Sequence, residues 1–266
     1  MPPPITSPQN SRLKQVVRLR DRRPRKQLGL FLIDGARQLA RALAAGVVVR
    51  EVYLPEGNDL ESNDLAVIEQ ARAVGAEVLE VARAVFPKIA YGDRDLGLVA
   101  VAQTPSFELT QLQLPADALI LVVEQIEKPG NLGAMLRTAD AAGCHALIVA
   151  DAVTDLTNPN VIRASMGAVF TVPVAQAESS IIYQWLLSHE FRILAARVDA
   201  AAEYSDANYR GRVALALGSE AEGLSDVWQG NAIQAIRLPM RGTVDSLNVS
   251  VTAAVLLYEA QRQRHC

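Results

Sequence analysis

Three short stretches of the chain combine glycine with polar side chains in patterns that could bind a ligand. The first, Lys128 to Gly143, reads KPGNLGAMLRTADAAG. Asn131 is a favourable helix N-cap residue, and Gly133 permits close approach of the backbone to another group. On a helical wheel Arg137 lies almost opposite the apolar side and is flanked by alanines. Arg137 is therefore either an ordinary exposed arginine or a cation with room to reach a ligand.

The second stretch, Leu215 to Ser225, reads LALGSEAEGLS and carries an apolar strand into a turn. Ser219 and Glu222 have the spacing of a capping box, which predicts a helix start. That motif leaves Glu220 unexplained, because it is an acid placed directly after a strand. The glycines on either side of Glu220 indicate that the backbone comes close to another surface here.

The third stretch is Ser246-Leu247-Asn248-Val249-Ser250, which lies between a loop at 239–244 and a predicted helix at 248–263. Three short polar side chains stand at one helix start, although a single cap would suffice. The stretch is therefore either only a loop and a cap, or one wall of a binding site.

The elements around these stretches form two successive patterns. In the first part of the chain, apolar runs and glycine stops predict a short basic helix at 12–22, strands at 28–33, 47–54, 77–79 and 98–102, and helices at 37–45 and 65–74. Later, longer apolar strands alternate with helices. Strands are predicted at 118–123, 146–150, 170–174, 191–196, 213–218 and 233–238, and helices at 131–142, 159–167, 179–189 and 248–263.

Apolar strands that alternate with helices predict an α/β fold, in which a parallel sheet is covered by helices on both faces. Such sheets bind ligands at the carboxyl ends of their strands. We therefore expect the three polar stretches, which follow or adjoin strand ends, to carry the chemistry.

The predicted domain organisation has four parts. Residues 1–10 are proline-rich and are expected to form a mobile tail, and residues 11–102 form an N-terminal α/β domain. Residues 103–116 contain two prolines and no clear periodicity, which is typical of a linker or a covering segment. Residues 117–266 form the second, larger α/β domain.

Positive charge is concentrated in one segment, although the chain of 266 residues has a net charge of −3. This net charge argues against a uniformly basic surface for binding nucleic acid. Between residues 12 and 26, basic side chains are opposed only by Asp21: they are Arg12, Lys14, Arg18, Arg20, Arg22, Arg23, Arg25 and Lys26. This basic segment is either a phosphate-contacting surface or a solvated helix at the terminus.

Composition argues against several classes of protein. No apolar run is long enough for a membrane span, and MPPPITSPQN lacks the apolar core of a signal peptide, which together predict a cytoplasmic protein. Cys144 and Cys266 are far apart and are expected to be reduced thiols, and the three histidines do not cluster with them, so no metal site is expected. Neither G-x-G-x-x-G nor a Walker A motif occurs, which disfavours a nicotinamide dehydrogenase and an NTPase.

Taken in order, the three polar stretches resemble the motifs of the SpoU branch of the SPOUT superfamily, the RNA ribose 2′-O-methyltransferases. The matching residues are Asn131, Gly133 and Arg137, then Gly218, Glu220 and Gly223, then Ser246 to Ser250. Residues 158–174, NPNVIRASMGAVFTVPV, and the terminal YEAQRQR are also similar to the family. The resemblance is strong over about 117–264. Over about 11–102 it is weaker, and there it is to a ribosomal-protein-like substrate-binding domain. One departure is Thr252, where the family often has alanine.

This resemblance implies a C-terminal parallel sheet with a deep trefoil knot, a homodimer with the terminal helix at its interface, and S-adenosylmethionine bound within the knot. The residues implied to contact the cofactor are Gly218, Leu238 and Leu247, with backbone groups near Glu220, Met240 and Asn248. The residues implied to be catalytic are Asn131, Arg137, Glu220, Ser246 and Asn248.

Transfer of a methyl group to a ribose hydroxyl requires that the hydroxyl lose its proton. The family assigns Arg137 to this step, but a guanidinium stays protonated in proteins, so a fork that grips the RNA phosphate and the 2′-oxygen is the better role. The phosphate or water would then take the proton. Expected contacts with RNA are Arg137, Arg163, Arg18 and Arg22.

The expected substrate is 23S ribosomal RNA, because the chain has an additional N-terminal domain. Transfer RNA is the alternative substrate within the family. A non-catalytic RNA-binding homologue is a further alternative, which the intact Asn131, Arg137, Glu220 and Asn248 disfavour.

Overall fold

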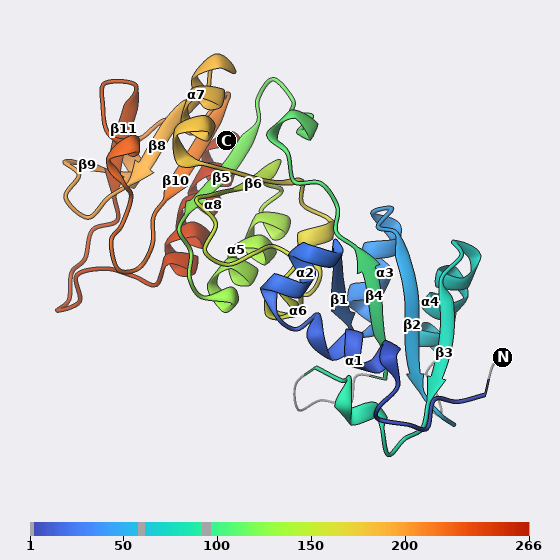
Figure 1. The fold of residues 1–266 in the computed structure, drawn as a ribbon. Helices are drawn as coiled ribbons and strands as arrows, with labels where there is room; N and C mark the ends of the chain where they lie inside the picture. Colours follow the sequence, from blue (N-terminus) through green and yellow to red (C-terminus); the bar gives the residue numbers. More distant parts are fainter. Residues whose placement is uncertain (1–2, 58–61, 92–96, 266) are drawn as a thin grey trace. The chain divides into compact units, whose positions relative to one another are not determined.

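The computed structural model describes residues 3–57, 62–91 and 97–265, and contacts divide the chain into two compact units (Figure 1). Unit 1 contains residues 1–106 together with 155–171, and unit 2 contains residues 107–154 and 172–266. The segment 155–171, which the sequence-based boundaries place in the second domain, therefore packs with the first. It carries Arg163.

Unit 1 is built on a four-stranded sheet in the order β1-β4-β2-β3. Its strands are β1 (Leu30–Asp34), β2 (Val49–Pro55), β3 (Glu77–Val81) and β4 (Val99–Gln103). The β1–β4 and β4–β2 pairs are antiparallel, whereas β2 and β3 are parallel. The helices are α1 (Ser11–Arg18), α2 (Arg22–Leu28), α3 (Ala36–Ala44), α4 (Ser62–Ala73) and α6 (Pro159–Ala164), with short 3₁₀ turns η1 (Phe86–Lys88) and η3 (Ala168–Phe170).

The basic segment forms two helices where one was predicted. The first ends at Arg18 and the second begins at Arg22. Pro24 is the reason, because a proline is tolerated in the first turn of a helix but would clash with the carbonyl of residue 20 inside a continuous one. That carbonyl instead accepts a hydrogen bond of 2.6 Å from Arg25 Nη1.

The segment predicted to be a mobile tail is attached to the sheet at Ile5. Its N–H donates to the Glu80 carbonyl at 2.8 Å, and its carbonyl accepts from the Ala82 N–H at 3.0 Å. Further along, the Asn10 side chain caps α1 by accepting from the Arg12 N–H. These contacts correct the expectation for residues 3–10, because an extended segment can add to an exposed sheet edge through backbone hydrogen bonds alone.

Unit 2 contains a seven-stranded sheet in the order β7-β6-β5-β10-β8-β11-β9, and every neighbouring pair is parallel. The predicted parallel α/β sheet is therefore confirmed. Its strands are β5 (Leu119–Glu124), β6 (Ala146–Ala150), β7 (Val174–Ala177), β8 (Arg192–Ala196), β9 (Ala202–Glu203), β10 (Val213–Leu217) and β11 (Ile233–Arg237). The helices are α5 (Pro129–Ala141), α7 (Ser179–Ser188) and α8 (Val249–Arg264), with 3₁₀ turns η2 (Leu109–Gln111), η4 (Tyr204–Asp206) and η5 (Asp226–Trp228).

The strand predicted at 170–174 is misplaced. Residues Ala168–Phe170 form the 3₁₀ turn η3, and β7 begins only at Val174. Gly167 is left-handed, with φ of 85°, and Pro173 has no N–H to donate to a ladder, so the apolar run between them cannot pair as a strand.

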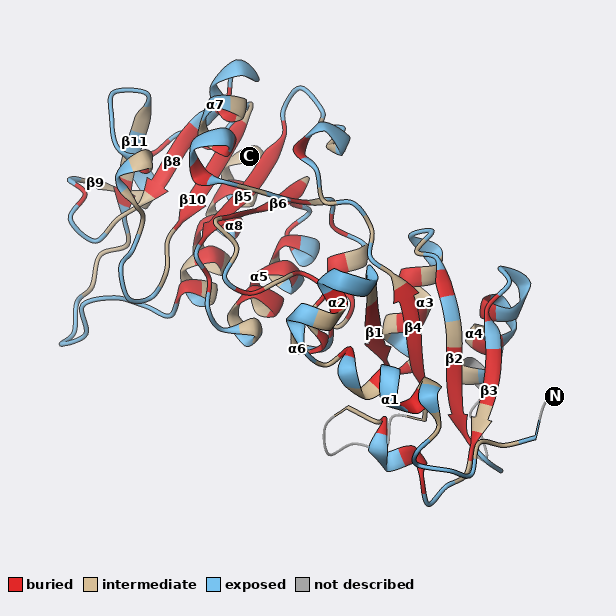
Figure 2. Ribbon diagram, in the orientation of Figure 1, coloured by how far each residue is buried: buried red, intermediate tan, exposed pale blue. Residues whose placement is uncertain are grey.

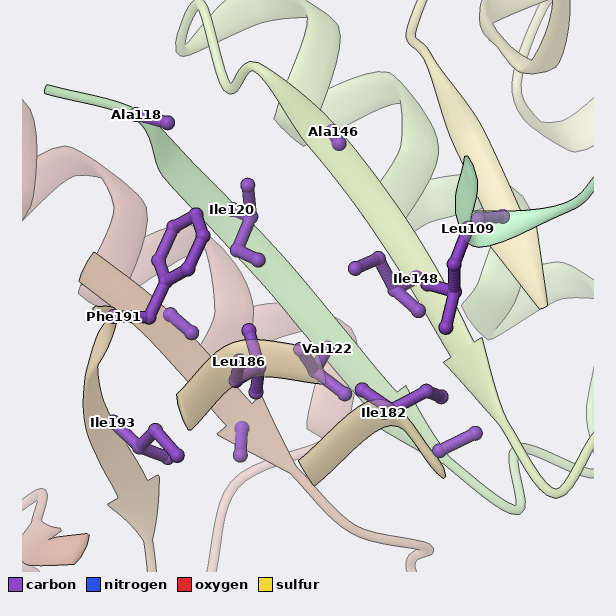
Figure 3. Close-up of a cluster of buried hydrophobic side chains, with 14 of the residues drawn as sticks. Leu109, Ala118, Ile120, Val122, Ala146, Ile148, Ile182, Leu186, Phe191 and Ile193 are labelled. Atoms are coloured by element: carbon purple, nitrogen blue, oxygen red, sulfur yellow. The ribbon is translucent and has the colours of Figure 1, made fainter. Parts of the chain in front are cut away.

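The central strands β5, β6 and β10 of the unit 2 sheet are buried along their whole length, and they are red in Figure 2. On one face, Ile120 and Val122 of β5 pack with Ile182 and Leu186 of α7 (Figure 3). Leu109 joins the same cluster, so the segment predicted as a linker or a covering segment covers this face. The odd positions of β5 are buried as well, and α5 and α8 pack against each other in the same unit.

The last helix is attached to the body of unit 2 through carbonyl groups. Arg264 donates to the carbonyls of Tyr209, Asp117 and Gly211, at 2.9, 2.5 and 2.6 Å. The Gln261 amide donates to the Ala142 carbonyl at the end of α5. These contacts fix α8, whose first residues lie at the candidate site described next.

Candidate active site

The side chain of Asn131 is not used to cap helix α5. The N-cap is Lys128 and Pro129 is the first helical residue, so Asn131 lies within the first turn. The prediction that Asn131 caps the helix is therefore wrong: Pro129, with its fixed φ and no N–H to satisfy, is favoured at the first helical position. The side chain of Asn131 instead donates to Glu220 Oε1 at 2.6 Å.

Glu220 is the centre of a cluster that joins all three polar stretches. Its Oε1 also accepts from Asn248 Nδ2 at 2.8 Å, and its Oε2 forms an ion pair with Lys128 Nζ. Asn131 and Asn248 contact each other directly, with 3.3 Å between Asn248 Nδ2 and Asn131 Oδ1. Residues more than a hundred positions apart in the sequence thus meet at one carboxylate.

Asn248 is both a helix cap and a member of this cluster. It is the N-cap of α8, and its Oδ1 accepts from the Ser250 N–H at 2.9 Å and from Ser250 Oγ at 2.6 Å. Its amide nitrogen remains available for Glu220. Asn248 is therefore not only a cap, because one end of its amide serves the helix and the other contacts Glu220. That the stretch forms one wall of a binding site stays a prediction.

The turn that presents Glu220 is closed by backbone contact. Ser219 and Gly223 exchange two N–H to carbonyl hydrogen bonds, each of 3.1 Å. A Cβ on Gly218 would lie 2.0 Å from the carbonyl carbon of Gly223, so only glycine fits there. The close approach predicted for these glycines is therefore to the turn's own backbone. Ser219 Oγ accepts from the Glu222 N–H at 3.0 Å, but no helix follows, so the predicted helix start is wrong.

Electrostatics keeps Glu220 ionised. Its hydrogen bond from Lys128, and secondarily that from Asn131, lowers the pKa of the carboxyl below its usual value. The same contact raises the pKa of the Lys128 ammonium. An anion that receives three donors holds them in a defined geometry.

A pocket of about 300 Å³ adjoins this cluster and is lined by Ile126, Glu127, Lys128, Asn131, Glu220, Ala221 and Val249. Lys128 was not among the predicted site residues. It immediately precedes the proline that starts α5, and this position was a signal that sequence reasoning could have used. The pocket combines apolar side chains with one cation, two acids and an amide, which suits a polar ligand.

Arg137 and Ser246 do not line that pocket. Arg137 is exposed on α5, while Leu132 and Met135 on the other side are fully buried, which confirms the predicted helix face. Within the described residues it forms no hydrogen bond or ion pair. Ser246 is also exposed. The structure therefore brings together three of the five predicted catalytic residues.

The remaining predicted cofactor residues follow β10 and β11 in the sequence. Leu238 and Met240 are half-buried, and Leu247 is 38% exposed. In the described part of the chain, the backbone of residues 239–247 forms no hydrogen bond with another backbone group. Backbone groups of this loop that have no backbone partner are open to a ligand, and the assignment of these residues to the cofactor stays a prediction.

The predicted RNA contacts lie in unit 1, apart from Arg137, and all of them are exposed. Arg18 is exposed. Arg22 is exposed too, with its Nε 4.0 Å from Asp155 Oδ2. Arg163 is exposed, and its guanidinium lies 5.8 Å from the centre of the Tyr91 ring.

Other basic side chains of the segment are engaged in holding the fold. Arg25 is 3% exposed and forms an ion pair with Asp155 at 2.7 Å. Arg12 binds Glu77 at 2.6 Å, and Arg20 donates to the carbonyls of residues 88 and 90. Lys14, Arg18, Arg22, Arg23 and Lys26 of the segment are exposed, so a phosphate-contacting surface, if the segment forms one, would consist of these side chains.

Two findings on the described residues concern metal binding and membrane insertion. No group of three or more histidine, cysteine or acidic side chains there could hold a metal ion. None of the described helices has both the length and the apolar character that crossing a bilayer requires.

Comparison with known proteins decides the family. The SpoU rRNA Methylase family matches residues 118–258. The chain belongs to this family. The MRM3-like substrate binding domain matches residues 10–100. The resemblance of the three motifs to the SpoU branch is thus confirmed.

Relatives with assigned activities align over most of the chain. A 23S rRNA (guanosine-2′-O-)-methyltransferase of Bordetella pertussis is 35% identical over 85% of this chain and 94% of its own length. A 23S rRNA (uridine(2479)-2′-O)-methyltransferase of Streptomyces viridochromogenes is 29% identical over 98% and 92%.

Solved structures agree over the whole chain. A structure described as an RNA 2′-O ribose methyltransferase is 44% identical, covers 99% of this chain and 100% of its own, and has a TM-score of 0.85. The SpoU methyltransferase AviRb of Streptomyces viridochromogenes, solved with S-adenosylmethionine, is 27% identical over 96% and 98%, with a TM-score of 0.88.

Proposed function

We propose that this SpoU family member transfers a methyl group from S-adenosylmethionine to a ribose 2′-hydroxyl of 23S ribosomal RNA. The observation that carries the proposal is the Asn131–Glu220–Asn248 cluster, which joins the three family motifs beside a pocket. The named activities of the relatives support the reaction and the RNA class.

The cofactor would be held by Gly218, Leu238, Met240, Leu247 and the backbone near Asn248. When bound, S-adenosylmethionine supplies a methyl group on a sulfonium, which is already a strong electrophile. The protein's task is therefore to orient the hydroxyl and to stabilise the charge that develops on its oxygen.

The pocket side chains divide that task. Glu220 fixes the amides of Asn131 and Asn248, so that they present fixed hydrogen-bonding groups to the ribose. Lys128 places a positive charge at the same wall, where it can stabilise the developing alkoxide or a neighbouring phosphate. Ser246 would shape the adjoining loop.

Arg137 would grip the RNA phosphate and the 2′-oxygen with its planar fork, and the phosphate or water would accept the proton. Because Arg137 does not line the pocket of its own subunit, we place its action in a homodimer formed through α8. Exposed apolar residues on that helix, Val251 and Tyr258, support such an interface.

Unit 1 would bind the RNA through Arg18, Arg22 and Arg163. The knot is part of the same proposal, with the turn at 218–223 and the loop at 238–247 as its crossing segments. These segments are the two that line the proposed cofactor site.

The direct test is methyl transfer from labelled S-adenosylmethionine to purified 23S ribosomal RNA, followed by mapping of 2′-O-methyl positions. We expect one modified position, and no label on transfer RNA. Arg137→Ala should abolish transfer and leave cofactor affinity within a few-fold, because Arg137 is not among the residues proposed to hold the cofactor. Labelling of transfer RNA alone, or of no RNA by folded protein that binds the cofactor, would overturn the proposal.

A mixing experiment tests the dimer. Arg137→Ala and Asn131→Ala subunits are each expected to be inactive alone. Mixed heterodimers should regain part of the activity if Arg137 of one subunit serves the pocket of the other. No recovery in verified heterodimers would place Arg137 at its own subunit's pocket.

A further inference from the structure

We infer that Glu124, which lies outside the pocket and outside the family motifs described above, is a positioning residue for the reaction. Its buried carboxylate fixes the start of α5 relative to the turn that carries Glu220. The inference rests on the proposed function, because the pocket it would position is the proposed methyl-transfer site.

Glu124 is the last residue of β5 and is only 1% exposed. It accepts hydrogen bonds from three residues on two other segments. Ser225 donates twice, from its N–H to Oε2 at 2.7 Å and from its Oγ to Oε1 at 2.7 Å. Trp228 Nε1 donates to Oε1 at 2.9 Å, and Ser179 Oγ, at the start of α7, also donates to Oε1.

The loop side of this network controls Glu220. Ser225 follows Glu220 by five positions, and the intervening turn is closed by the Ser219–Gly223 hydrogen bonds. The turn is therefore attached at one end to β10 and at the other to Glu124. Loss of the second attachment would let Glu220 move while β10 stays in place.

The other side of the network controls Lys128 and Asn131. Lys128 follows Glu124 by four positions, and the connecting backbone has little freedom. Gln125 is in the left-handed region, with φ of 52°, and its N–H donates to the Ala150 carbonyl at 3.0 Å. Thr154 Oγ1 donates to the Glu127 carbonyl at 2.5 Å. The position of Glu124 thus determines where α5 begins.

The charge environment explains why a glutamate is needed. A buried carboxylate is tolerated only when donors satisfy it, and here backbone, hydroxyl and indole groups do so. Asp151 is the other acid in this network: its Oδ2 lies 2.7 Å from Ser179 Oγ, and its Oδ1 accepts from the Ser179 N–H at 3.2 Å. A glutamine at 124 would keep the shape but place an NH₂ group against these donors, so the loop would lose its register.

The test separates positioning from simple stability. Glu124→Gln and Trp228→Phe are compared with Ser179→Ala, which removes a donor on the α7 side and leaves the loop side intact. Single-turnover methyl transfer is measured at saturating S-adenosylmethionine and RNA, below the unfolding temperature of each variant. A misplacement of about 1 Å predicts a rate lowered by roughly 100-fold in the first two variants. Ser179→Ala should keep its rate within a few-fold although its Tm falls.

A second readout does not depend on activity. In a Trp185→Phe background, Trp228 is the remaining tryptophan, so its emission and its quenching by acrylamide report on the loop. Glu124→Gln should raise the quenching, whereas Ser179→Ala should not. Unchanged rate and quenching in Glu124→Gln, or equal rate losses in all three variants, would overturn the inference. If Glu124→Gln does not fold, the rate of Trp228→Phe relative to that of Ser179→Ala decides the question. An inactive wild-type protein with these quenching differences would count against the proposed function and not against the inference.

Discussion

The basic segment of unit 1 and the Glu220 cluster of unit 2 use charge in opposite ways. The basic segment concentrates its charges in fifteen consecutive positions, 12–26, yet four of its side chains bind the protein's own carboxylates and carbonyls. The cluster draws Lys128, Asn131, Glu220 and Asn248 from three distant stretches, and all four are in direct contact around one carboxylate.

The difference shows that local charge density is a poor measure of binding surface. Contiguous arginines are conspicuous in a sequence, but a folded chain can use them for its own capping and pairing. A single acid after a strand is inconspicuous, but the meeting of strand ends at one edge of a parallel sheet can make it the centre of a site. The following predictions test this contrast, from the largest expected effect to the smallest.

Gly218→Ala should have the largest effect. The added Cβ would lie 2.0 Å from the backbone of Gly223, so the turn that carries Glu220 cannot keep its shape. We expect loss of measurable S-adenosylmethionine binding by calorimetry. Gly130→Ala is the matched control, because its Cβ meets no atom within 4 Å. Wild-type cofactor affinity in Gly218→Ala would show that the turn is not part of the cofactor site.

Glu220→Gln should lower kcat by about 100-fold, as expected for loss of a preorganising charge, with a smaller change in cofactor affinity. The reason is that a neutral amide no longer attracts Lys128, and its NH₂ group would replace the Oε2 acceptor that faces the Lys128 ammonium. Steady-state kinetics measures this change. Glu222→Gln serves as the control, because Glu222 is exposed and only its backbone N–H contacts the turn. Equal losses in both variants would indicate a general charge effect.

Arg18→Gln should weaken RNA binding modestly and lower the slope of log affinity against log salt by about 1. Arg12→Gln should leave the slope unchanged, because Arg12 is bound to Glu77. Filter binding at several salt concentrations distinguishes the two variants. A slope that falls equally for both would mean that the whole segment acts as a diffuse charge.

Asp34→Asn should have the smallest effect, on stability alone. Burial raises the pKa of Asp34 to about 6, despite the N–H of Tyr91 and the nearby Arg163 and Arg20. Between pH 4 and 6 the folded protein therefore holds a proton that the unfolded chain has released, so this group's contribution to stability falls as pH rises.

The asparagine variant lacks this penalty. Its Tm relative to the wild type should therefore be higher at pH 8 than at pH 4, by a few degrees. Thermal unfolding at the two pH values measures the difference. A pH-independent difference would show that Asp34 titrates normally.

Much of the fold could be predicted from periodicity. The apolar strands β5, β6, β8 and β10 and their parallel direction follow from continuous apolar runs, which are typical of strands buried on both faces; their order in the sheet was not predicted. The exposed face of α5 followed from helical spacing. The strand at 170–174 was misplaced because an apolar run between Gly167 and Pro173 gives no local sign of a 3₁₀ turn.

Several residues of the candidate site could be predicted from the sequence, but the hydrogen bonds between them could not. Asn248 was recognisable as a cap, whereas its second bond to Glu220 depends on tertiary structure. Glu124 gave no strong local signal, because an acid at a strand end is common, and the only local sign for Lys128 was its position before the proline that starts α5. Their roles emerge only when β5, β10 and α8 are placed side by side.

The attachment of α8 by Arg264 and Gln261 also concerns the order in which the protein folds. Arg264 contacts Asp117 across 147 positions, and Asn248 contacts Asn131 across 117. Because the entropy of closing such long loops must be lost before these contacts form, the pocket is expected to be among the last parts to assemble. When refolding is monitored by cofactor binding, it should therefore be slower than when it is monitored by helix content.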